Sequence, residues 1–220
     1  MDDIIFLFDV DNTLLDNDRI QGDLRAYLAE TYGEATRDRY WAIFEDRFAT
    51  LGYADYLGAV ERCRLEALDD PRLLGMASWL IDYPFAERLY PGALEAVSHV
   101  RQWGRVVVLS DGDAVYQPRK VDRSGLWSAF DGEILIFVHK EKELDIVERL
   151  YPARRYVVID DKLRILSAVK SVWGERVATV FPRQGRYAND AKALETYPPA
   201  DVAIGAIRDI VTLDRDAFSP

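Results

Sequence analysis

The chain has 220 residues, which is enough for one large domain or for a core domain that carries an insertion. Acidic residues outnumber basic ones by 38 to 28, and the net charge of −10 argues against a nucleic-acid polymer as the main ligand, because binding its backbone requires a basic surface. A small phosphorylated ligand held by one or two cations is compatible with this charge.

The sequence gives no indication of export, of a membrane span or of a zinc site. The single cysteine, Cys63, rules out an intrachain disulfide and suits a reducing compartment. The two histidines, His99 and His139, are too far apart to form a zinc site of the usual spacing. The first residues do not resemble a signal peptide, and no run of 18 apolar residues exists. We therefore expect a cytoplasmic protein that does not span a membrane, with its oligomeric state open.

The first predicted element is a strand, Ile4–Phe8, followed by the polar stretch Asp9-Val10-Asp11-Asn12-Thr13. Its continuous apolar run is typical of a strand buried on both faces of a parallel sheet. Ligands bind at the carboxyl ends of such strands. Two carboxylates two residues apart raise each other's pKa unless a cation lies between them, and Mg²⁺ is the natural candidate. A capped turn is the alternative explanation for this stretch taken alone.

Helical spacing of apolar residues dominates the next segment, from residue 16 to residue 88. Gly33 and Gly52 interrupt the pattern, and Pro71 suits the first turn of a new helix. We therefore predict an all-helical insertion of about 70 residues. Its many aromatic side chains fit the core of a small bundle, and the alternative is that a few of them line a substrate pocket.

Strands and helices alternate after Tyr90-Pro91-Gly92, which predicts a parallel sheet with right-handed crossovers. The expected strands are 105–109, 133–138, 156–159, 177–180 and 201–204. The expected helices are 93–103, 141–150 and 163–172, with a last helix from residue 207. Segments 113–120 and 181–187 are predicted loops, and the second of them either borders the site or lies on the surface.

The first four predicted strands all end in residue types that phosphoryl chemistry requires. Carboxylates hold Mg²⁺, while serine and lysine side chains hold phosphoryl oxygens. Each residue alone is ordinary, because adjacent acids also cap helices and lysines are usually solvated. The ordered set is Asp9 and Asp11, then Ser110, then Lys140, then Asp160 and Asp161.

This ordered set resembles the four motifs of the haloacid dehalogenase superfamily. The resemblance covers residues 1–15 and 88–212, whereas the helical insertion matches only in position and type. It implies an α/β fold with a Rossmann-like parallel sheet core (three-layer α/β/α) and an inserted all-helical cap. The implied domains are a core of residues 1–15 and 89–220 and a cap of residues 16–88.

The resemblance also implies an enzyme, a Mg²⁺-dependent phosphatase that acts on a small phosphorylated metabolite. Asp9 would be the nucleophile that forms an aspartyl-phosphate, and Asp11 the general acid and base. The implied phosphate-binding residues are Ser110, Asp111 and Lys140, with Lys142 as an alternative and Lys120 as a weaker one. The implied metal ligands are Asp9, Asp11 through its carbonyl, Asp160 and Asp161, and which of the last two touches the metal directly is open.

Three alternatives accompany this prediction. Haloalkanoate dehalogenases resemble the chain but lack an acid two residues after the nucleophile, so Asp11 favours phosphate esters. A phosphoryl-accepting signalling domain also combines Asp, Ser or Thr and Lys around Mg²⁺, although there the acceptor follows a middle strand. The third alternative is a binding module without enzymatic activity, since a fold does not fix a function.

Overall fold

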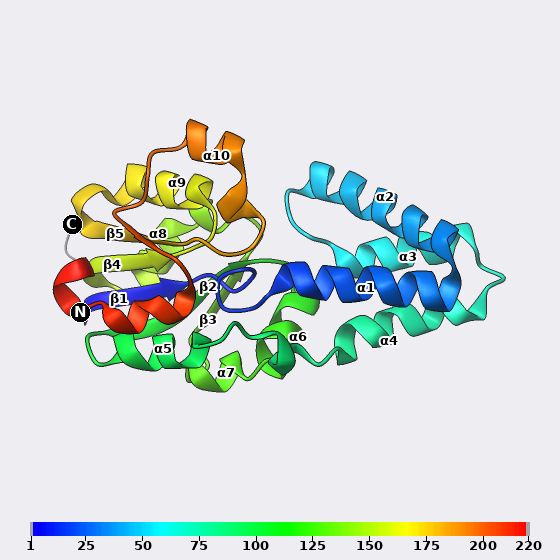
Figure 1. Cartoon of the computed structure of the whole chain (residues 1–220), viewed down its shortest axis with the longest axis horizontal. Coiled ribbons are helices and arrows are strands. Elements are labelled where there is room, and N and C mark those ends of the chain that lie inside the picture. The colour runs from blue at the N-terminus through cyan, green and yellow to red at the C-terminus, as the bar shows by residue number, and fades with distance from the viewer. Residues whose placement is uncertain (1, 219–220) are drawn as a thin grey trace.

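The computed structural model describes residues 2–218. A six-stranded, fully parallel sheet forms the centre of the part of the molecule that contains both termini (Figure 1). The strands are β1 (Asp2–Phe8), β2 (Arg105–Asp111), β3 (Ile134–Phe137), β4 (Ala153–Ile159), β5 (Val177–Pro182) and β6 (Val202–Ile204). Their order is β3-β2-β1-β4-β5-β6. β1 is therefore a central strand, which explains its continuous apolar sequence.

Helices cover both faces of the sheet, so the predicted three-layer α/β/α core is confirmed. Phe6 and Phe8 of β1 belong to the apolar cluster on one face, and Ile5 and Leu7 belong to the cluster on the other. The first face is covered by α5 (Ala93–Arg101), α6 (Tyr116–Arg123) and α7 (Leu126–Ala129). The second is covered by α8 (Leu144–Leu150) and α9 (Leu163–Trp173), and the short α10 (Ala191–Thr196) packs against α9.

The helices between β1 and α5 gather beyond the carboxyl ends of the strands (Figure 1). They are α1 (Asn17–Tyr32), α2 (Glu34–Leu51), α3 (Tyr56–Glu66) and α4 (Leu74–Asp82), with 3₁₀ turns at Pro71–Leu73 and Phe85–Arg88. The two connections to the sheet lie side by side, because the Asp16 N–H donates to the Arg88 carbonyl at 2.7 Å and the Tyr90 N–H to the Leu14 carbonyl at 2.9 Å. We call the helical region from Asn17 to Arg88 the cap.

Several predicted elements differ in detail from the observed ones. The segment 113–120, expected as a loop, contains most of α6, whose Pro118 sits in the first turn where a missing N–H is tolerated. The helix expected over 141–150 is a 3₁₀ turn at Lys140–Lys142 followed by α8. The last helix, expected from residue 207, is the 3₁₀ helix Ile207–Thr212.

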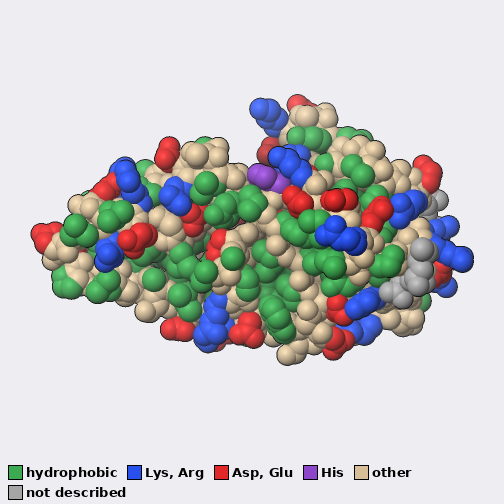
Figure 2. Space-filling model, turned by 180° about the vertical axis from the view of Figure 1, so that it is seen from behind, with side chains coloured by type: hydrophobic (Ala, Val, Ile, Leu, Met, Phe, Trp, Pro, Cys, Tyr) green, Lys and Arg blue, Asp and Glu red, His purple; other side chains and the backbone are tan. Residues whose placement is uncertain are grey.

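The surface carries charges of both signs. Figure 2 shows acidic and basic side chains interspersed with apolar ones on the face opposite to that in Figure 1. Within residues 2–218, every helix is too short or too polar to cross a membrane.

Candidate active site

The candidate site lies at the carboxyl ends of β1 and β4, where the order of the strands changes direction. Phe8 of β1 pairs in register with Ile159 of β4, so Asp9 and Asp160 leave neighbouring strands at the same level. The Asp9 N–H still donates to the Ile159 carbonyl, at 2.9 Å. In doubly wound sheets this switch point is where ligands bind.

Three buried carboxylates meet at this point. Asp9, Asp160 and Asp161 each offer an oxygen within 4.8 Å of the others. The Oδ2 atom of Asp9 and both carboxylate oxygens of Asp161 are buried without a hydrogen-bond partner among residues 2–218. Burial, together with the nearby charges of Asp9 and Asp160, raises the pKa of Asp161 well above its ordinary value. Buried and unpaired carboxylate oxygens at this spacing fit a hard divalent cation, and Mg²⁺ takes such ligands.

Lys140 supplies the ammonium group that contacts this cluster. Its Nζ lies 2.5 Å from Asp9 Oδ1, 2.7 Å from Asp160 Oδ2 and 3.0 Å from the carbonyl oxygen of Leu109. Burial alone would lower the pKa of Lys140, but the carboxylates of Asp160 and Asp9 outweigh it and raise that pKa. Lys142 is exposed. Of the two lysines that the sequence left as alternatives, Lys140 is therefore the one at the carboxylates.

Ser110 and Asp111 end the neighbouring strand β2 and lie at the same edge of the sheet. The Ser110 hydroxyl oxygen accepts a hydrogen bond from Gln117 Nε2 at 3.0 Å. Asp111 Oδ1 accepts from the backbone N–H of Lys140 at 2.8 Å, which fixes the start of the segment that carries the lysine. Burial raises the pKa of Asp111 in spite of the nearby positive charge of Lys140. Ser110 is buried, and within residues 2–218 its hydroxyl group forms no hydrogen bond with a carboxylate of the cluster.

Asp11 lies outside the three-carboxylate cluster and has its own cation. Lys120 Nζ donates to Asp11 Oδ1 at 2.8 Å and to Oδ2 at 2.9 Å. The Lys120 side chain is completely buried, whereas 21% of the Asp11 side chain is exposed. The sequence offered Lys120 as a weak candidate for binding phosphate, and its pairing with Asp11 was missed. The helical spacing of Tyr116, Lys120 and Val121 would have placed all three on the buried face of a helix.

The segment after β5 supports the first motif, so the predicted loop 181–187 borders the site. Gln184 Nε2 donates to the carbonyl oxygens of Asn12 at 3.1 Å and Thr13 at 2.7 Å. Asn12 has a left-handed backbone with φ of 62°. A Cβ atom at Gly185 would lie 2.7 Å from the Asn12 Cβ, so only glycine permits this close approach. In turn, Thr13 Oγ1 accepts from the backbone N–H of Asp161 at 3.1 Å.

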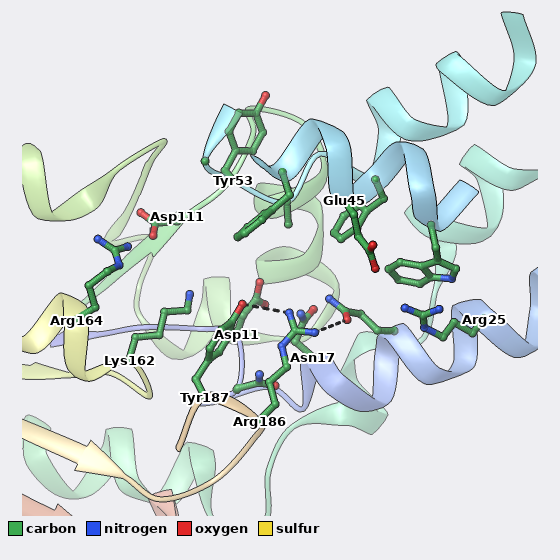
Figure 3. Close-up of a pocket in the computed structure, with 17 residues that line it drawn as sticks. Asp11, Asn17, Arg25, Glu45, Tyr53, Asp111, Lys162, Arg164, Arg186 and Tyr187 are labelled. Atoms are coloured by element: carbon green, nitrogen blue, oxygen red, sulfur yellow. Dashed lines mark hydrogen bonds between the residues drawn. The ribbon is translucent and has the colours of Figure 1, made fainter. Parts of the chain in front are cut away.

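A cavity of about 430 Å³ lies between the cap and the sheet and is lined by Asp11, Asp111 and Lys162 on the side of the sheet. Aromatic side chains of α2 and of the loop after it, among them Trp41 and Tyr53, also line the cavity. Figure 3 shows Tyr53 across the cavity from Lys162. Both readings of the aromatic residues therefore apply. Some line the cavity, whereas others, such as the fully buried Tyr40, belong to the apolar core.

The polar side chains of the cavity come from both parts of the molecule. Figure 3 shows Arg186 reaching toward the cap, where its Nη1 donates to Gln21 Oε1 at 2.9 Å. The Arg25 guanidinium lies 3.8 Å from the centre of the Trp41 ring. The cavity thus offers positive charge and aromatic surface to whatever extends beyond the carboxylates.

Comparison with known proteins decides the family. The sequence model of the haloacid dehalogenase-like hydrolases matches residues 5–172. The chain belongs to this family. The crystal structure of a haloacid dehalogenase-like hydrolase from Burkholderia xenovorans LB400 is 57% identical, covers 98% of both chains and superposes with a TM-score of 0.93. A sequence search of curated proteins gave no match.

More distant members of the haloacid dehalogenase-like fold resemble the chain in fold alone. A haloacid dehalogenase-like family hydrolase from Xanthomonas campestris is 19% identical with a TM-score of 0.67, and covers 98% of this chain and 92% of its own. The L-2-haloacid dehalogenase from Xanthobacter autotrophicus is 16% identical with a TM-score of 0.62, and the match covers 95% of this chain and 97% of the dehalogenase. The predicted membership of the superfamily is therefore confirmed, and the substrate class is a separate question.

Proposed function

We propose that this hydrolase is a Mg²⁺-dependent phosphatase that acts on small phosphomonoesters through an aspartyl-phosphate on Asp9. The observation that supports it most directly is the set of unpartnered carboxylate oxygens in the buried cluster. Lys140 contacts Asp9 and Asp160, but Oδ2 of Asp9 and both oxygens of Asp161 are buried without a hydrogen-bond partner within residues 2–218, and a divalent cation would neutralise them. The magnesium-bound structure of the family member YfnB from Bacillus subtilis, 16% identical to this chain, is consistent with the proposal.

In the proposed reaction an Asp9 carboxylate oxygen attacks phosphorus while the bond from phosphorus to the ester oxygen breaks. Asp11 gives its proton to the departing oxygen, so that a neutral alcohol leaves. Water then attacks the aspartyl-phosphate, Asp11 takes the proton of that water, and the bond between phosphorus and Asp9 breaks. Lys140 and Ser110 would steady the phosphoryl oxygens. Mg²⁺, held by Asp9, Asp160, Asp161 and the Asp11 carbonyl, would supply positive charge to these oxygens.

The decisive experiment is release of inorganic phosphate from a panel of alkyl phosphate esters. We expect turnover with Mg²⁺, its loss in EDTA and its recovery when Mg²⁺ is added back. The panel also tests the proposed ligand class, a small phosphorylated metabolite. Stoichiometric phosphorylation by acetyl phosphate without turnover would instead identify a phosphoryl-accepting domain. Absence of both would favour a binding module.

The second candidate is a haloacid dehalogenase-type hydrolase, which the fold of the Xanthobacter enzyme favours. Asp11 argues against it, because a departing halide needs no proton whereas a departing alkoxide does. Halide release from a 2-haloalkanoate, measured with and without EDTA, separates the two. Release of halide that is unaffected by EDTA, without release of phosphate from any ester, would replace the phosphatase proposal.

A further inference from the structure

Lys120 is a buried cation whose ammonium group donates hydrogen bonds to Asp11 and Asn17. It lies on the inner side of α6 with no exposed surface, and its Nζ donates to both oxygens of Asp11 and to Asn17 Oδ1 at 3.2 Å. Within residues 2–218, Asp11 is the one acid that forms an ion pair with it. A buried ammonium group is costly unless it is paired, so the two side chains hold each other in place.

The residues around the Lys120 ammonium group come from both the core and the cap. Its Nζ lies 5.2 Å from the ring centre of Tyr116, on the same helix, and 5.8 Å from that of Tyr56 on α3. Asn17, which accepts its third hydrogen bond, is the first residue of α1. These contacts fix the ammonium group from three sides, and Lys120 in turn fixes the carboxylate of Asp11 at the edge of the cavity.

We infer that Lys120 is a positioning residue, which holds the Asp11 carboxylate ready to accept a proton during hydrolysis of the aspartyl-phosphate. This inference rests on the proposed phosphatase function. In that step the water oxygen bonds to phosphorus, the bond from phosphorus to Asp9 breaks with its electron pair returning to Asp9, and one water proton moves to Asp11. A carboxylate that receives hydrogen bonds from a fixed ammonium group cannot rotate away from the water, and small misplacements of a catalytic group are costly.

The test is Lys120→Met, assayed with an aryl phosphate whose leaving group needs no proton. Formation of the aspartyl-phosphate should be nearly unaffected. Because kcat/KM reports only the steps up to and including the first irreversible one, it should stay within about threefold of the wild-type value. Hydrolysis of the intermediate should slow, so kcat should fall by about 10²-fold. Rapid mixing should then show a burst of aryl alcohol equal to the concentration of enzyme, followed by slow turnover.

The matched control is Lys142→Met, which removes an exposed ammonium group whose side chain forms no ion pair or hydrogen bond within residues 2–218 and leaves the backbone bond from the Lys142 N–H to the His139 carbonyl in place. It should keep wild-type kcat and show no burst. If Lys120→Met does not fold, Lys120→Gln, which retains a polar group near Asn17, undergoes the same assays and should give the same result.

Three outcomes are informative. Low kcat with a burst supports the inference. Equal losses of kcat and kcat/KM in a folded variant, or no loss of kcat, would overturn it, because a purely structural residue affects both steps alike. A wild-type protein that releases no phosphate from any ester would instead refute the proposed function on which the inference rests.

Discussion

Each carboxylate of the Asp9–Asp11 pair has a buried ammonium group of its own. Lys140 contacts Asp9 within the three-carboxylate cluster, and Lys120 contacts Asp11 beside the cavity. The two acids are only two residues apart, yet their partners come from different elements and their surroundings differ in burial. Different environments allow two identical side chains to take different roles, here the proposed nucleophile and the proposed acid and base.

The proposed nucleophile is tested by Asp9→Asn. An amide is a poor nucleophile and a weaker metal ligand, so we expect phosphatase turnover to disappear. Release of phosphate from an alkyl ester measures it, and Asp145→Asn, at an exposed position on α8, should behave as the wild type. Substantial activity in a clean preparation of Asp9→Asn would exclude the aspartyl-phosphate.

Asp11→Asn tests the proposed acid and base. Loss of proton transfer should lower kcat on an alkyl phosphate by about 10²–10⁴-fold. On an aryl phosphate, kcat/KM should change much less, because its leaving group scarcely needs a proton. Steady-state kinetics on the two esters provide the comparison, and an unchanged rate on the alkyl ester would leave Asp11 with a structural role only.

At the scale of elements, the loop between α2 and α3 touches the core next to Lys140. Gly52 ends α2 in a left-handed conformation with φ of 80°, and a Cβ atom there would lie 2.3 Å from His139 Cε1. Gly52→Ala should therefore push the cap away from the site and lower kcat/KM, by roughly tenfold if the cap is displaced by an ångström or less.

A matched control exists for the backbone strain in Gly52→Ala. Gly125 has nearly the same conformation, with φ of 84°, but a Cβ atom there meets nothing within 4 Å. Backbone strain should cost each variant about 1 kcal/mol of stability in urea unfolding, to which Gly52→Ala adds the clash with His139, and only Gly52→Ala should lower kcat/KM. Adding His139→Ala to Gly52→Ala should restore part of the loss. Equal kinetics for the two glycine variants would show that this contact does not position the cap.

Continuous apolar runs predicted the central strands well, because burial on both faces leaves no room for polar residues. β3 is shorter than expected and half-buried, as befits the strand at the edge of the sheet. The position of Asp9, Lys140 and Asp160 at one edge followed from the rule that parallel strands end together. The roles of Lys120 and Gln184 could not be foreseen, because Lys120 lies within a helix and Gln184 in a loop, so the rule that parallel strands end together places neither of them.

For the whole molecule, one apolar cluster runs without a break from the sheet into the cap. The rings of Tyr56, in the cap, and Tyr116, in the core, are 4.9 Å apart at their centres. Replacing residues 16–88 by a linker would expose Tyr116 and the buried Lys120. Single substitutions in the cap are therefore the sharper test of whether the cap selects the substrate.

Arg25→Ala is such a substitution, because Arg25 lines the cavity and its guanidinium stacks on Trp41. We expect it to change the ratio of kcat/KM between preferred and poor esters by about tenfold or more, while inhibition by inorganic phosphate stays the same. Arg62→Ala, which removes another exposed arginine of the cap away from the cavity, should preserve the ratio. If Arg25→Ala also preserves it, specificity lies elsewhere, for example in Arg186 and Tyr187.

The central place of β1 also determines the order in which the chain can fold during translation. Phe8 stands in register with both Val108 and Ile159, so the first strand to leave the ribosome completes its pairing only after residues 153–159 have been made. The helices of the cap pack mainly on their neighbours along the chain and can form earlier. Until β4 emerges, the apolar segment Ile4–Phe8 has an unpaired edge, and the nascent chain needs protection from aggregation during that interval.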